Sequence, residues 1–174
     1  MKKSLVAGAA SLAFAAMPVV GVFATNPAAV QDQLTVTVNE SCTFARVGGS
    51  DTIAETMTAG QLKSDFGGNT FKSTCNNGKG YDINATFTDL TITSGTGAAI
   101  TYDGTAAPTA NSGTWNASVG GSILDKTDDV IGSRNTQDPS GGSTYTVSYA
   151  VSVHNDQAKG TYSGTATYSL VMKS

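Results

Sequence analysis

Few side chains in this sequence have the chemistry that catalysis requires. His154 is the only histidine among 174 residues, and it lies with Asp156 in a stretch of turn-forming residues. A nucleophilic site needs a nucleophile, a base and an orienting group, and the chain has no Gly-x-Ser-x-Gly, no His-Glu-x-x-His and no phosphate-binding glycine loop with lysine. We therefore predict a non-enzymatic protein with no catalytic residues and no cofactor. A hydrolase that pairs Asp128 or Asp129 with Asp156 as acid and base is the last-ranked alternative.

Metal binding is disfavoured by the spacing of the candidate ligands. Asp125, Asp128 and Asp129 could offer oxygens to calcium, but they lack the alternate-position spacing of a calcium-binding loop. Cys42, Cys75 and one histidine supply at most three zinc ligands, and their spacing matches no zinc motif. The sequence therefore predicts no metal site.

Trp115 and Tyr102 form the candidate ligand platform. Trp115 is the only tryptophan of the chain, and a sugar ring could stack on two neighbouring exposed aromatic faces. A lone tryptophan in a β domain is more often a large core residue. A carbohydrate-binding module, with glycans as partners, is therefore the alternative function.

The two cysteines, Cys42 and Cys75, are the only ones in the chain. An even number of cysteines in an exported protein indicates disulfide bonding, and with two of them only one pairing exists. We predict that Cys42 and Cys75 form a disulfide, with two free buried thiols as the alternative.

Residues 1–24 have the pattern of a secretory signal peptide. Lys2 and Lys3 precede an apolar run, and Val22 and Ala24 put small or tolerated residues at the −3 and −1 positions of a cleavage site, so we expect cleavage after Ala24. The run is about 20 residues long, so an uncleaved membrane anchor is the alternative, but Pro18 and the abundance of alanine favour cleavage. The sequence thus predicts a protein that is secreted or at the cell surface, without membrane contact once the signal is removed.

The composition favours β-structure and excludes nucleic-acid binding. The chain contains 20 Gly, 25 Thr and 18 Ser, whereas helix-rich proteins depend on Ala, Leu, Glu and Lys. Only 13% of the residues are charged, and the net charge of −3 gives no basic surface for nucleic acid. We expect one threonine-rich all-β domain.

Alternation of apolar and polar residues predicts the strands, because successive side chains of a strand point to opposite faces. The predicted strands cover residues 34–38, 71–75, 81–87, 145–153 and 162–172, with shorter ones near 100–102 and 115–119. Residues 76–80 contain two Asn and two Gly and predict a tight hairpin. Residues 154–160 join the last two long strands, and residues 56–65 have weak helical character. Several short strands joined by such turns indicate a β-sandwich or barrel.

The order of these parts resembles bacterial fimbrial subunits of the chaperone–usher type and spore-coat-U-like surface proteins. A signal peptide is followed by an alternating segment with Leu34, Val36 and Val38, then by Cys42 and Cys75, and the chain ends in an alternating strand with Gly160 and Tyr168. The resemblance implies an immunoglobulin-like antiparallel β-sandwich over residues 39–174, with one disulfide, preceded by an N-terminal extension or first strand over 25–38. It further implies a structural or adhesive, pilin-like subunit whose partners are identical subunits or other surface proteins, with Leu34, Val36 and Val38 as candidate strand-donor residues.

Overall fold

The computed structural model describes residues 33–127 and 129–174. It divides the chain into two units, Met1–Thr37 and Val38–Ser174. The predicted signal peptide, residues 25–32 and Asp128 lie outside the described residues. In the first unit, residues 33–37 form no strand.

The second unit is built from strands, which confirms the predicted all-β class. The strands are β1 (Cys42–Gly48), β2 (Leu62–Cys75), β3 (Tyr81–Phe87), β4 (Thr91–Ile92), β5 (Thr101–Tyr102), β6 (Thr114–Val119), β7 (Ser122–Ile123), β8 (Asp129–Arg134), β9 (Ser143–Ser152), β10 (Tyr162–Ser163) and β11 (Ala166–Met172). The described residues contain no helix, so none that could cross a membrane. The helical character expected for residues 56–65 is therefore wrong: Leu62 begins β2, and the residues before it form a loop with a turn at Ala59 and Gly60.

The larger sheet has six strands in the order β1-β2-β9-β6-β5, and β7 pairs with β6. The antiparallel β1–β2 pair places Cys42 opposite Cys75 and Phe44 opposite Ser73. Next to it, β9 places Val147 opposite Asn69 of β2. The pairing between β5 and β6 is parallel, while the others in this sheet are antiparallel.

The smaller sheet has the order β11-β3-β8, and a separate two-stranded pair joins β10 to β4. The continuous stretch predicted over 162–172 is thus two strands in two different sheets, separated at Gly164 and Thr165. A Cβ on Gly164 would lie 2.8 Å from the carbonyl oxygen of Asp89, so any larger residue at this position would clash with the backbone of Asp89. β8 begins at Asp129, one of the three aspartates considered above as calcium ligands.

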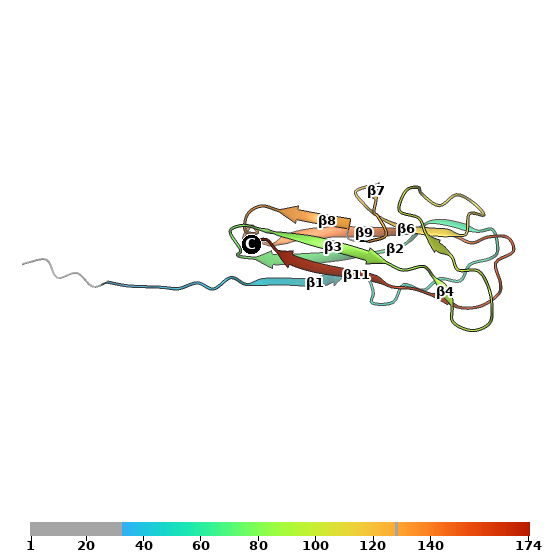
Figure 1. The fold of residues 1–174 in the computed structure, drawn as a ribbon, viewed down its shortest axis with the longest axis horizontal. Coiled ribbons are helices and arrows are strands. Elements are labelled where there is room, and N and C mark those ends of the chain that lie inside the picture. The colour runs from blue at the N-terminus through green and yellow to red at the C-terminus, as the bar shows by residue number, and fades with distance from the viewer. Residues whose placement is uncertain (1–32, 128) are drawn as a thin grey trace, which may run out of the picture. The chain divides into compact units, whose positions relative to one another are not determined.

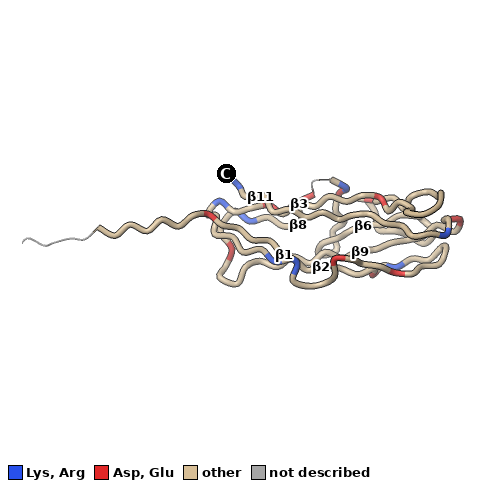
Figure 2. Tube along the Cα trace, turned by 90° about the horizontal axis from the view of Figure 1, so that it is seen from below, with Lys and Arg blue, Asp and Glu red and all other residues tan. Residues whose placement is uncertain are grey.

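The two sheets face each other in two layers, with β1, β2 and β9 in one layer and β11, β3 and β8 in the other (Figure 2). Their alternating apolar side chains meet between the layers, and β3 shows the pattern best: four of its side chains are buried and the three between them are partly exposed. The buried apolar side chains of β3 and β9 are Tyr81, Ile83, Ala85, Phe87, Val147, Tyr149 and Val151. Burial of the apolar row is the main favourable contribution to folding.

The connection over residues 76–80 differs from its prediction. It joins β2 of the larger sheet to β3 of the smaller one, so it crosses between the layers and is not a hairpin. Asn77 is completely buried in this connection, and its Nδ2 donates to the carbonyl oxygens of Gly80 and Lys173. These bonds tie the crossing to the end of β11.

Candidate functional site

Two strand edges are open on the same side of the domain. β1 ends one sheet and β11 ends the other, and the two lie side by side (Figure 1). Within the described residues, no backbone hydrogen bond joins them and neither has a partner on its outer edge. Unpaired N–H and C=O groups along such an edge can pair with a further strand.

Aromatic rings fill the space between β1 and β11 at one end. The ring centroids of Phe44 and Phe71 lie 5.4 Å apart, and those of Phe71 and Tyr168 lie 4.5 Å apart. These contacts connect β1, β2 and β11 through side chains rather than through backbone pairing. The two edges therefore stay close without forming one sheet.

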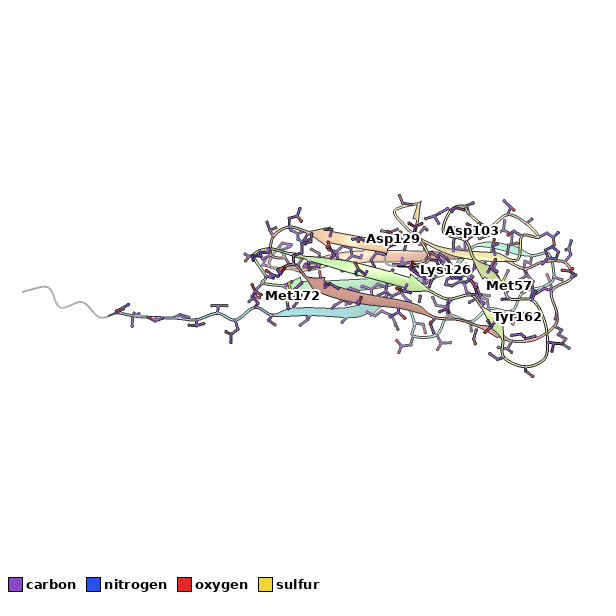
Figure 3. The ribbon with its side chains drawn as sticks, in the orientation of Figure 1. Met57, Asp103, Lys126, Asp129, Tyr162 and Met172 are labelled. Atoms are coloured by element: carbon purple, nitrogen blue, oxygen red, sulfur yellow. A yellow bond between two sulfur atoms is a disulfide. The ribbon has the colours of Figure 1, made fainter. Side chains whose placement is uncertain are left out.

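Beyond the end of β1 the layers enclose a cavity of about 940 Å³. The loop between β1 and β2 and the segment around β10 both contribute to its lining, and Met57 and Tyr162 from these two segments lie at the same end of the domain (Figure 3). Its apolar lining includes Ile53, Met57, Phe66, Leu90, Ile100 and Val153. A cavity of this size and apolar character is typical of ligand-binding or peptide-binding grooves.

Tyr149, Tyr168 and Asn69 contribute polar groups to the lining of the cavity. The hydroxyls of Tyr149 and Tyr168 lie 2.7 Å apart and connect the two sheets. Asn69 accepts a hydrogen bond from the backbone N–H of Ser50 at 3.0 Å and borders the same cavity. Burial raises the pKa of Tyr168, so its hydroxyl is neutral and contributes a hydrogen bond rather than a charge.

Trp115 and Tyr102 are both buried, at 5% and 7% exposure. Tyr102 stacks on Phe87 at 4.6 Å, and Trp115 meets Tyr102 edge-on at 4.7 Å. Neither ring offers an exposed face, so the two residues are part of the core rather than a surface platform. Trp115 nevertheless borders the cavity, and its buried Nε1 has no hydrogen-bond partner in the described part of the chain.

The candidate strand-donor residues are exposed. Leu34, Val36 and Val38 have 90%, 86% and 77% of their surface accessible, and the backbone of residues 33–41 belongs to no strand. Each of these three aliphatic side chains would favour burial, because transfer of apolar surface out of water is favourable.

The predicted disulfide between Cys42 and Cys75 is present. It joins the first residue of β1 to the last residue of β2, which are directly opposite each other in the sheet. The closed loop contains the rest of β1 and nearly all of β2.

A buried carboxylate near the crossing at residues 76–80 was missed by the sequence reasoning. Asp138 accepts hydrogen bonds from the hydroxyls of Ser73, Tyr81 and Ser143, and its side chain is 1% exposed. The Nε atom of Arg134 lies 3.5 Å from the same carboxylate. Burial acts to raise the pKa of Asp138, but the three hydrogen bonds and the charge of Arg134 outweigh it, so the pKa lies below its ordinary value.

The side chains considered for catalysis or metal binding are dispersed. His154 contacts Asp156 in an exposed loop. Asp129 accepts a hydrogen bond from the backbone N–H of Asp125 at 2.7 Å, which closes its own loop. No group of three or more His, Cys, Asp or Glu side chains suited to a metal occurs in the part of the chain that the structure describes.

Comparison with known proteins gives no relative. No protein-family model, no curated protein and no solved structure matches this chain.

Proposed function

We propose that this protein is a pilin-like structural or adhesive subunit, secreted or held at the cell surface, that assembles by strand donation between copies. In this proposal, residues 39–174 form an immunoglobulin-like β-sandwich whose edge is left open between β1 and β11. The strand that closes the edge is the N-terminal extension, residues 25–38, of another copy.

The observation that carries the proposal is the open edge between β1 and β11, with the apolar cavity beside it. A strand added along the free edge of β1 would pair with the free backbone groups there, and its continuation past the end of β1 would cover the cavity. Strand addition of this kind obtains affinity from main-chain hydrogen bonds and specificity from pockets for alternate side chains.

The extension has the length and the pattern that such an edge requires. β1 and β11 each have 7 residues, and an extended segment of residues 25–38 would span about 46 Å, twice the length of either strand. We call the free edge of β1 together with the cavity beyond its end the groove. Leu34, Val36 and Val38 would enter this groove, while Gln33, Thr35 and Thr37 would face outward. Burial of the three aliphatic side chains would contribute roughly 5–8 kcal/mol before the cost of ordering the segment.

The proposal is tested with two triple variants of the exported full-length chain. Replacement of Leu34, Val36 and Val38 by serine removes the groove-filling side chains and should leave monomers. Replacement of Gln33, Thr35 and Thr37 by serine changes the same segment on its other face and should leave assembly intact. Electron microscopy and size-exclusion chromatography with light scattering distinguish filaments from single particles.

Deletion of residues 25–38 should likewise give monomers. Monodisperse monomers from the intact chain at high concentration, with residues 33–38 accessible to protease, would contradict strand donation.

A further inference from the structure

Asn76 holds the residues that lead into β1. The backbone N–H of Asn76 donates to the carbonyl oxygen of Ser41 at 3.0 Å, and the N–H of Ser41 donates to Oδ1 of Asn76 at 2.6 Å. Nδ2 of Asn76 donates to the carbonyl oxygen of Asn39 at 2.9 Å. We call this set of three bonds the exit clamp. It continues the pairing of Cys42 with Cys75 by one residue, beyond the end of both strands.

The sequence pattern offers a way for the extension to close its own domain. A turn over residues 39–41 would fold the extension back along the free edge of β1, with Val38 opposite Cys42 and Val36 opposite Phe44. Directly opposed residues of an antiparallel pair share a face. The two valines would therefore lie on the face of Phe44, which packs against Phe71 in the interior.

Such a hairpin would consume the donor strand within one molecule. The copy that formed it would neither give nor need a strand, and assembly would stop. A protein that assembles by donation therefore needs something that keeps the extension from turning at residues 39–41.

The exit clamp opposes that turn. A hairpin would have to break the bonds of Asn76 to both Asn39 and Ser41, because these bonds hold the intervening backbone in line with β1. Turns of three residues also favour a glycine in the left-handed region, and residues 39–41 are Asn, Glu and Ser. We propose that Asn76 acts as a positioning residue that keeps the extension available to a second copy; this inference rests on the proposed function.

Trp115 provides the signal for a test. It is the only tryptophan and borders the cavity, so its fluorescence emission reports whether the groove is filled. In the wild-type chain, filling comes from a second copy, so the emission should change with protein concentration. In Asn76→Ala, which removes two of the three clamp bonds, the emission should show a filled groove at every concentration.

Light scattering gives the second readout. The ratio of self-closed monomer to assembled protein should rise roughly tenfold or more in Asn76→Ala, the effect of losing two ordinary hydrogen bonds. Asn76→Asp keeps the acceptor for Ser41 and loses only the donor to Asn39, so its shift should be smaller. Asn135→Ala removes another exposed asparagine side chain, which among residues 33–127 and 129–174 bonds to Lys173 alone, and should behave as wild type.

The outcomes separate the clamp from the proposed function. If Asn76→Ala and Asn76→Asp both assemble as the wild type does, the role of Asn76 is wrong while strand donation stands. If the wild type is monomeric with a filled groove at every concentration, it closes on itself despite the clamp, and the inference is again overturned. If the wild type is monomeric with an empty groove throughout, strand donation itself fails.

Discussion

Replacement of Asp138 by alanine should destabilise the domain more than any surface substitution. The carboxylate is 1% exposed, accepts hydrogen bonds from three hydroxyls and lies beside Arg134. Its removal leaves buried hydroxyls without their acceptor and takes the negative charge away from the partly buried Arg134 guanidinium. Loss of one partner from a buried charged network costs about 3–5 kcal/mol.

Urea unfolding followed by circular dichroism would measure this loss. For a domain of this size, the same loss corresponds to a fall in melting temperature of about 10–15 °C. Asp103→Ala is the matched control, because every hydrogen bond that the Asp103 carboxylate makes in the described part of the chain lies within its own turn, to Thr105 and Ala106. We expect that control to cost about 1 kcal/mol.

A loss below about 1 kcal/mol for Asp138→Ala would refute the reasoning. It would mean that the hydroxyls of Ser73, Tyr81 and Ser143 find other partners or water, and that the carboxylate does not organise the network.

Two further predictions concern acid and reduction. The folded state holds the pKa of Asp138 below its ordinary value, so the stabilisation by this carboxylate is present above the unfolded pKa of about 4 and is lost as the pH falls through the folded pKa. The urea midpoint should therefore fall more steeply between pH 5 and 2 in the wild type than in Asp138→Asn. Parallel curves for the two proteins would contradict this. Reduction of the disulfide, or Cys75→Ala, should cost roughly 3.5–4 kcal/mol from loop entropy, and an unchanged melting temperature after reduction would show that the disulfide contributes little.

Alternation predicted the strands best where one side of the strand is fully buried. β3 matches the predicted 81–87, and β9 covers most of the predicted 145–153. β8 was missed because Asp129 and Gly132 are typical of loops, and its edge position demands little apolar alternation. The extent of β2 was also missed, since two adjacent glycines interrupt its pattern.

Turn composition did not show which sheet each strand joins. The Asn and Gly residues over 76–80 suit a hairpin and a crossing between layers equally well, because both need backbone conformations that these residues tolerate. The choice depends on the distant pairing of β2 with β9 and of β3 with β11, which no local pattern contains.

The candidate site depends on the same distant pairings. The candidate strand-donor residues Leu34, Val36 and Val38 are visible in the sequence, but the open edge exists only because β1 and β11 end their sheets. Asp138 lies in a Pro-, Ser- and Gly-rich segment with the composition of an exposed loop, so its burial could not be predicted. Asn76 likewise looks like an ordinary turn residue until Ser41 is placed opposite it.

The position of the disulfide has a mechanical consequence. A pull on the chain before Cys42, resisted by the C-terminal half of the domain, passes through the sulfur–sulfur bond from position 42 to position 75 and bypasses residues 43–74. β1 therefore carries none of this tension, and the domain cannot lengthen by unfolding of β1 while the disulfide is intact. Reduction would release about 100 Å of slack once those residues unfold.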